Sequence, residues 1–224
     1  MSGTEDDAPR PKAHIFKRGE LEFDRLAFFS DAIYAISLTL LVVDLAVPTI
    51  SDASSGQDLW EALGDVSSEI LMFFISFLVI GSFWLAHHRF VAKLGAVDRT
   101  LMFGSLCYLS FIAFLPFPSG LLGEYADNPV AVALYALCIA AVASLEVVLF
   151  AVARRRDLLT VSPTDEVFRW GIAAGLAPAG LFLLSIPIAF VSPLLGILSW
   201  ILNIPLGVTL GHRMGAAANE YYDT

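Results

Sequence analysis

An acidic residue lies inside an apolar segment near the N-terminus, where ionised groups are rare. Asp31 follows Ser30 in the stretch EFDRLAFFSDAIYAISLTLLVVDLAVP, about two helical turns from its polar end, and Arg25 precedes both. A carboxylate at the centre of a membrane span costs about 2.5–3.5 kcal/mol, so an ionisable residue there is a functional hypothesis by default. The alternative is that Asp31 lies at a shallow depth and is solvated from the cytoplasm.

A second group of polar side chains closes the next apolar segment, which ends SFWLAHHRF. Consecutive spans run antiparallel, so this end is level with the start of the first segment. Trp84, His87 and His88 can therefore meet Ser30 and Asp31. An imidazole or indole N–H donated to the carboxylate would offset part of its burial cost. The alternative is that these are interfacial residues of an aromatic belt.

The first segment also has a distinct apolar stripe. At 100° per residue, Ile36, Thr39, Leu40 and Val43 fall within an arc of about 100°, and Asp31 lies about 140° away from Ile36. One face is thus apolar except for a hydroxyl, and another carries the carboxylate. Most stripes of this kind are packed in a core, so the pattern alone favours no function.

Composition indicates the elements that must position these residues. Hydrophobic residues make up 57% of the 224-residue chain, above the 45–50% typical of soluble domains. They form blocks of about 20 residues, which is typical of membrane-spanning helices. We predict an all-α membrane protein with six transmembrane helices, at 23–47, 70–90, 101–122, 130–153, 168–188 and 193–210. Prolines 178, 187, 193 and 205 can kink or break the last two.

The basic residues predict the orientation. All 13 Lys and Arg fall on one side of these spans: Arg10, Lys12, Lys17, Arg18, Arg25, Arg89, Lys93, Arg99, Arg154, Arg155, Arg156, Arg169 and Arg213. The opposite loops carry only carboxylates: Asp52, Asp58, Glu61, Asp65, Glu69, Glu124 and Asp127. By the positive-inside rule both termini are cytoplasmic in a multi-pass protein of the cell membrane. We expect a flexible cytoplasmic tail at 1–20, a transmembrane domain at 21–213 and a short cytoplasmic tail at 214–224.

Several functional classes are disfavoured. Cys107 and Cys138 lie in apolar blocks and form neither a disulfide framework nor a metal ligand set. The net charge of −9, without a basic patch away from the membrane flanks, speaks against nucleic-acid binding. No paired-carboxylate, HExxH or nucleophile motif suggests an enzyme. We therefore expect neither catalysis nor a cofactor.

Three patterns resemble the prokaryotic members of the transmembrane protein 175 family of potassium channels. They are Arg25-x-x-x-Phe29-Ser30-Asp31 followed by Ala35-Ile36-x-x-Thr39-Leu40-Leu41, then Phe83-Trp84-x-x-His87-His88, and Leu115-Pro116-Phe117-Pro118 followed by Glu124. The resemblance covers the first three spans, about half of the chain.

The resemblance implies a potassium-permeable cation channel that also admits other monovalent cations. Four identical chains would surround a central pore lined by the first span, without the re-entrant carbonyl filter of ordinary potassium channels. The constriction positions of the family correspond to Ile36, Leu40 and Val43, where Val43 replaces a more usual leucine, and Thr39 supplies a possible selectivity hydroxyl. The family also implies a structural polar network, which here comprises Arg25, Phe29, Ser30, Asp31, Trp84 and His87.

A ring of apolar side chains can gate a pore by dewetting, and no TVGYG-like filter sequence occurs in this chain. The alternative reading is a proton-coupled secondary transporter that uses Asp31, His87 and Glu146 as relay groups. Glu146 has no obvious partner in the sequence. A structural membrane subunit is a further alternative, since the small residues Gly171, Gly175 and Ala179 can pack helices closely.

Overall fold

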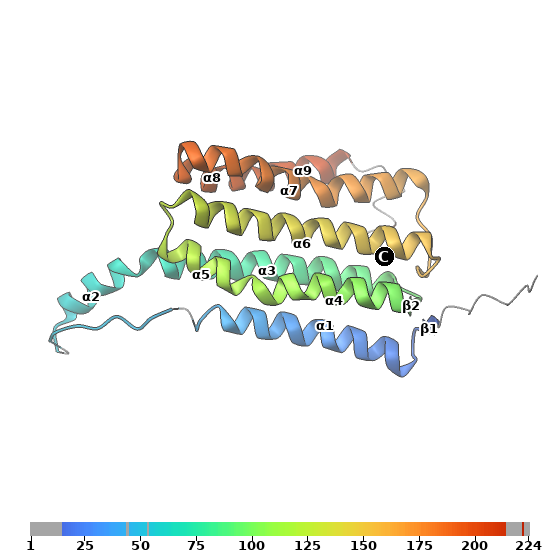
Figure 1. Cartoon of the computed structure of the whole chain (residues 1–224), viewed down its shortest axis with the longest axis horizontal. Helices are drawn as coiled ribbons and strands as arrows, with labels where there is room; N and C mark the ends of the chain where they lie inside the picture. Colours follow the sequence, from blue (N-terminus) through green and yellow to red (C-terminus); the bar gives the residue numbers. More distant parts are fainter. Residues whose placement is uncertain (1–14, 44, 53, 214–220, 222–224) are drawn as a thin grey trace, which may run out of the picture.

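The computed structural model describes residues 15–43, 45–52, 54–213 and 221. These residues form a bundle of long helices that lie side by side along one direction (Figure 1). The helices are α1 (Leu21–Leu40), α2 (Gly56–Asp65), α3 (Ser67–Lys93), α4 (Arg99–Phe114), α5 (Pro116–Glu124), α6 (Pro129–Arg155), α7 (Asp165–Val191), α8 (Pro193–Ser199) and α9 (Asn203–Arg213). A short 3₁₀ turn, η1 (Trp200–Leu202), joins α8 to α9, and two strands, β1 (Ile15–Lys17) and β2 (Ala96–Asp98), complete the described elements.

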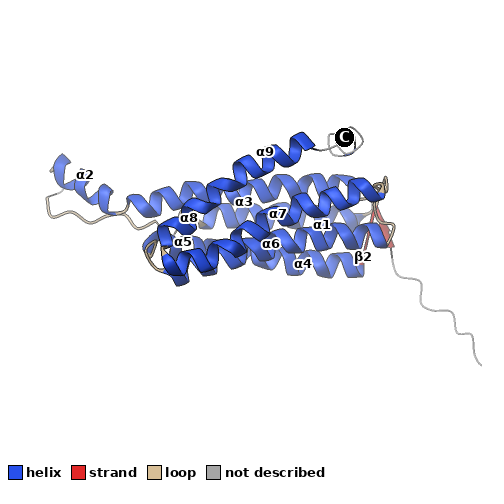
Figure 2. Ribbon diagram, turned by 90° about the horizontal axis from the view of Figure 1, so that it is seen from above, coloured by secondary structure: helices blue, strands red, loops and turns tan. Residues whose placement is uncertain are grey.

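Among the residues that the structure describes, five stretches are long and apolar enough to cross a membrane. They are Ser67–Lys93, Arg99–Glu124, Pro129–Arg155, Asp165–Val191 and Pro193–Gly211, and each overlaps one predicted span. The helix α1 is not among these apolar stretches, because it contains four charged residues, Glu22, Asp24, Arg25 and Asp31. It nevertheless packs against α3 and α4 and runs along the bundle with them (Figures 1 and 2).

The first predicted span is longer than the helix that forms. The helix α1 ends at Leu40 and is followed by a turn over 41–43, so the expected helical segment up to residue 47 was wrong. The β-branched residues Val42, Val43 and Val47 favour extended backbone. Pro48 also disfavours helical backbone at the residue before it.

Prolines do not all interrupt the later spans in the same way. Pro116 has no backbone N–H, and the third span divides there into α4 and α5. The helix α7 runs unbroken through Pro178 and Pro187. The last span is interrupted at η1, where Trp200 stacks on Tyr135 of α6 with ring centroids 5.2 Å apart. The Trp200 indole also donates a hydrogen bond of 2.8 Å to the Ser185 hydroxyl, so tertiary contacts hold this broken span against α6 and α7.

A small sheet closes one end of the bundle. The strands β1 and β2 pair antiparallel, with Phe16 opposite Val97. Asp98 caps α4 by accepting from the Leu101 amide at 2.8 Å, and its other oxygen accepts from the Arg156 guanidinium. The predicted flexible tail at 1–20 therefore includes a paired strand at 15–17, because backbone groups of the connection between α3 and α4 satisfy it. Residues 1–14 and most of the expected tail at 214–224 lie outside the described residues.

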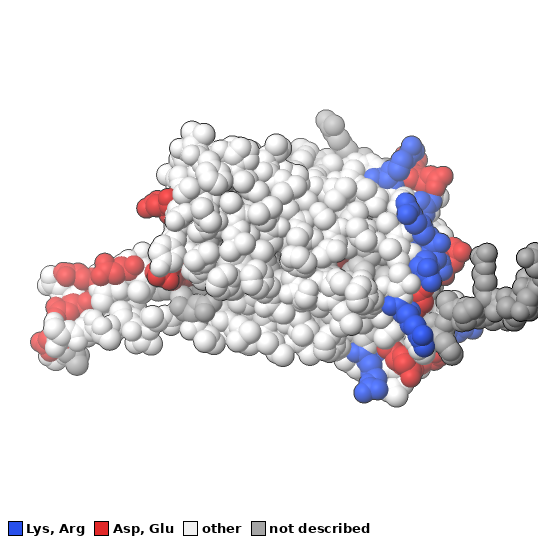
Figure 3. Space-filling model, viewed as in Figure 1, with Lys and Arg blue, Asp and Glu red and all other residues white. Residues whose placement is uncertain are grey.

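Charges separate along the bundle. On the face shown in Figure 3, Lys and Arg side chains gather, together with some Asp and Glu, at the end that carries β2, and the charged side chains visible at the opposite end are all acidic. The acidic end includes α2, which extends beyond the bundle (Figure 1). Ser55 begins this helix, since its hydroxyl accepts from the Asp58 amide at 3.1 Å. Part of the acidic loop between the first two predicted spans is thus a helix.

Candidate functional site

The helix α1 has one face packed in the bundle and one face left open. Phe23, Ser30, Tyr34 and Ser37 are buried. The side chains of Ile36 and Leu40 are 54% and 43% exposed, and Val43, beyond the helix end, is 71% exposed. Within a single chain the apolar stripe is therefore not part of the core. Thr39 shares this open face, and its hydroxyl donates to the Ile36 carbonyl at 2.8 Å.

Asp31 contacts the second predicted span, as expected for antiparallel spans whose ends lie at the same depth. The Trp84 indole of α3 donates to an Asp31 carboxylate oxygen at 2.9 Å. Ser30 does not join this contact, because its hydroxyl donates to the Leu26 carbonyl of its own helix at 2.9 Å. Asp31 is thus tied to the neighbouring helix by one hydrogen bond and keeps an exposed position.

His87 meets a different carboxylate from the one expected. Its ring is 3% exposed, and its Nδ1 lies 3.1 Å from Glu146 Oε2 of α6. The ring also stacks on Tyr108 of α4, with centroids 4.9 Å apart. The expectation that Glu146 lacks a partner was therefore wrong, and so was the expected meeting of His87 with Asp31. His87 and Glu146 lie on α3 and α6, and only the packing of the bundle determines which sides of these two helices face each other.

A pair of tyrosines connects the contact between His87 and Glu146 to α1. The hydroxyls of Tyr34 and Tyr108 form a hydrogen bond, and both rings are buried. We call Tyr34, His87, Tyr108 and Glu146 the buried polar cluster; it joins α1, α3, α4 and α6. Sequence reasoning missed both tyrosines, although Tyr34 lies one turn after Ser30 and shares its face.

Of the expected polar network, only His87 belongs to this cluster. Arg25 and Phe29 have exposed side chains on α1, and Phe29 is 45% exposed. The structure thus brings Asp31 to Trp84 and His87 to Glu146 as two separate contacts. Among the described residues no group of three or more His, Cys, Asp and Glu side chains is placed to hold a metal ion.

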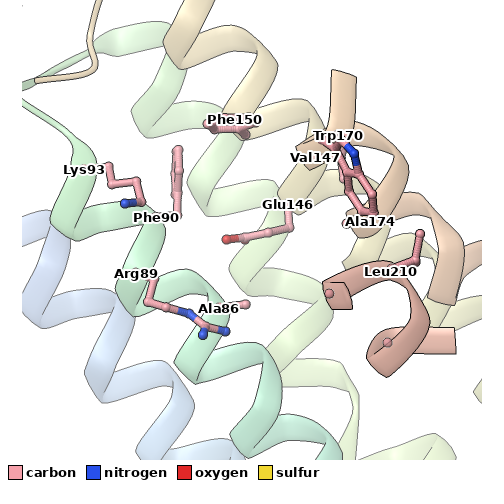
Figure 4. Close-up of a pocket in the computed structure, with 14 residues that line it drawn as sticks. Ala86, Arg89, Phe90, Lys93, Glu146, Val147, Phe150, Trp170, Ala174 and Leu210 are labelled. Carbon is pink, nitrogen blue, oxygen red and sulfur yellow. The ribbon is translucent and has the colours of Figure 1, made fainter. Parts of the chain in front are cut away.

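A cavity of about 650 Å³ adjoins the buried polar cluster. Figure 4 shows Glu146 at its inner wall, with Arg89 and Lys93 of α3 on one side and Trp170 of α7 on the other. Glu146 uses Oε2 for His87, while its Oε1 is buried without a hydrogen-bond partner in the part of the chain that the structure describes.

Comparisons with known proteins agree on one family. The family model described as endosomal/lysosomal potassium channel TMEM175 matches residues 25–116. A potassium channel of Chamaesiphon minutus is 30% identical over 188 residues, which are 76% of this chain and 86% of that protein. A potassium channel of Streptomyces collinus is 40% identical over 126 residues, which are 54% of this chain but only 60% of the relative. The mouse endosomal/lysosomal proton channel TMEM175 is 30% identical over 114 residues, 23% of its length.

A solved structure supports the same assignment. The crystal structure of a lysosomal potassium-selective channel TMEM175 homolog from Chamaesiphon minutus superposes with a TM-score of 0.68 at 26% identity. The match covers 87% of this chain and 98% of that chain. With its apolar membrane-spanning helices and the sequence patterns of its first three spans, the chain belongs to the TMEM175 family of potassium channels.

Proposed function

We propose that this protein is a potassium-permeable cation channel in which four identical chains surround a pore lined by α1. The observation that carries the proposal is the open apolar face of α1, with Ile36 and Leu40 exposed, on a helix whose opposite face is packed in the bundle. A single bundle fills its own interior, so a continuous aqueous path needs several copies. Cyclic symmetry places equivalent faces around one axis.

We further propose that α1 also spans the membrane, which brings the number of spans to six, and that the basic end of the bundle is cytoplasmic. Glu22, Asp24 and Arg25 lie in the first turns of α1, at the end where the sheet and the basic residues lie. Only Asp31 is then at greater depth, and the Trp84 hydrogen bond lowers the cost of its burial. The positive-inside rule supports the orientation.

In this arrangement the constriction is made of apolar side chains. Rings of Ile36 and Leu40 offer a cation no ligand and close the pore by expelling water from it. The Thr39 hydroxyl donates its hydrogen to the Ile36 carbonyl, so the lone pairs of its oxygen remain available to a passing cation. Val43 lies in the turn after α1, so a third ring depends on how that turn is arranged around the axis. The outer carboxylates would raise the local cation concentration.

Flux into liposomes tests the proposal. Purified protein is reconstituted, and potassium and sodium uptake are compared under ion gradients without a proton gradient. We expect uptake of both ions, faster for potassium, and a further increase in the Ile36→Asn variant because an amide wets the constriction. The control is Leu184→Asn, since Leu184 is 65% exposed on α7, away from the proposed pore helix. This variant should leave uptake unchanged.

Two outcomes would reject the channel. Uptake that is absent under every ion gradient rejects conduction. Uptake that requires a proton gradient and is lost in Asp31→Asn supports the coupled carrier instead. Proton uptake is recorded in the same liposomes with a pH-sensitive dye, because the vertebrate relatives are named proton channels.

A further inference from the structure

A tyrosine on the buried side of α1 connects this helix to its neighbour. The buried residues of α1 are Phe23, Ser30, Tyr34 and Ser37, and at 100° per residue all lie within about 60° of Tyr34. The two serine hydroxyls donate to carbonyl groups of α1 itself. Among the described residues on this side of the helix, Tyr34 is thus the one whose side chain hydrogen-bonds to another helix, through the Tyr108 hydroxyl of α4.

The proposed constriction residues lie on the opposite side of the same helix. By the same count, Ile36 and Leu40 are about 160° and 120° from Tyr34, and both side chains are exposed. A single helical turn or two is stiff, because its backbone hydrogen bonds fix the relative directions of its side chains. The contact that fixes the direction of Tyr34 therefore also fixes the directions of Ile36 and Leu40.

Apolar packing by itself fixes the rotation of a membrane helix only weakly. Lipid tails are as apolar as leucine, so turning an apolar helix exchanges one apolar environment for another. A hydrogen bond is different because it is directional. Turning α1 would break the bond between Tyr34 and Tyr108 and leave two buried hydroxyls without a partner, which is costly.

The partner of Tyr34 is itself held in place. The Tyr108 ring is fully buried in α4, and the His87 ring of α3 stacks on it with centroids 4.9 Å apart and an interplanar angle of 18°. His87 is held in turn, since its Nδ1 lies 3.1 Å from Glu146 Oε2 of α6. Tyr108 is therefore a fixed point in the bundle and cannot follow α1 when that helix turns.

We propose that Tyr34 is the positioning residue of the pore helix. Its bond to Tyr108 fixes the rotation of α1 about its own axis, and the rest of the buried polar cluster holds Tyr108. Ile36 and Leu40 are thereby kept directed at the pore axis. The inference rests on the proposed function for the place of that axis, but not for the rotation of α1. Without the bond, α1 turns more freely, the apolar constriction widens, and discrimination between potassium and sodium falls.

Thiol modification measures the rotation of α1 without any ion flux. Ile36→Cys and Ser37→Cys are made singly, since these positions are about 100° apart on the helix and their side chains are 54% and 1% exposed. The reconstituted full-length protein is treated with a small cationic methanethiosulfonate. Reaction of the native Cys107 and Cys138 is measured without an added cysteine and subtracted. We expect faster reaction at position 36 than at position 37, and a ratio of the two rates about fivefold smaller when Tyr34→Phe is added, which is the change in population that one ordinary hydrogen bond supports.

Two further variants separate positioning from general loosening of the bundle. Tyr108→Phe breaks the same bond from the other side, so it should act as Tyr34→Phe does, and it repeats the test if Tyr34→Phe does not fold. Tyr135→Phe is the matched control. The Tyr135 ring is 1% exposed, and its hydroxyl bonds to Ser76 of α3 at 3.5 Å, so this variant also loses a buried hydroxyl contact, but not one that involves α1.

Ion uptake into liposomes then connects rotation to discrimination. Tyr34→Phe and Tyr108→Phe should lower the ratio of potassium to sodium uptake, and Tyr135→Phe should change neither this ratio nor the ratio of thiol reaction rates. An unchanged ratio of reaction rates in Tyr34→Phe, or an equal change in Tyr135→Phe, would overturn the positioning role. A changed ratio of reaction rates with unchanged ion discrimination would overturn its connection to the constriction. A changed ratio of reaction rates with no uptake in any protein would support the hold on α1 and reject the channel instead.

Discussion

Removing the hydroxyl of Tyr34 tests how firmly α1 is held to the bundle. The Tyr34 and Tyr108 rings are 1% and 0% exposed, and their hydroxyls form a hydrogen bond. In Tyr34→Phe the Tyr108 hydroxyl stays buried and loses this partner, which costs about 1–3 kcal/mol in the free energy of unfolding. Replacing both residues by Phe removes donor and acceptor together. Because such paired replacements are often nearly neutral, the double variant should be more stable than the sum of the two single changes predicts.

The assay is reversible unfolding in mixed micelles, followed by tryptophan fluorescence as the denaturing detergent increases. The four proteins of the cycle are compared under one condition, so the coupling is obtained as a difference. We expect a coupling of at least about 1 kcal/mol. Additive effects of the two single variants would refute the reasoning, since they would mean that the hydroxyls do not depend on each other. Single variants as stable as the unmodified protein would refute the burial cost as well.

Three further changes in the free energy of unfolding follow from the structure. Arg156→Ala leaves the buried Asp98 carboxylate without its guanidinium partner and should lower the free energy of unfolding by about 1–3 kcal/mol. Arg155 is an exposed neighbour, so Arg155→Ala should change the free energy of unfolding little. The same unfolding assay compares the two variants. A methyl group at Gly196 would come within 3.1 Å of the Ala189 backbone, so Gly196→Ala should destabilise by about 1–3 kcal/mol. Gly180→Ala meets nothing within 4 Å and should be stabilising by about 0.5–1 kcal/mol; a loss of stability equal to that of Gly196→Ala would contradict this reading.

The positions of five long apolar helices could be anticipated because a bilayer leaves backbone groups no alternative partner. The apolar blocks became helices, and the basic and acidic loops lie at opposite ends of the bundle. The contact of Trp84 with Asp31 was also accessible, since antiparallel spans place those positions at the same depth. Each of these inferences depends on distance along a helix, which the chain determines by its 1.5 Å rise per residue.

Rotation of each helix about its own axis was not accessible in the same way. A membrane span is apolar on its lipid side and on its core side, so hydropathy does not say which neighbour a polar residue faces. The pairing of His87 with Glu146, and of Tyr34 with Tyr108, therefore required the packed bundle. The open position of Ile36 was likewise decided by packing.

Sequence patterns by themselves determined that this chain is a helical membrane protein of the TMEM175 type, because hydropathy, charge bias and short motifs are local properties. Tertiary structure alone decided which face of α1 remains open, and that Glu146 borders both the buried polar cluster and a cavity. These features arise from contacts between residues far apart in the chain. Such contacts depend on how neighbouring helices rotate and tilt to fill shared space, and periodicity within one helix carries no information about that fit.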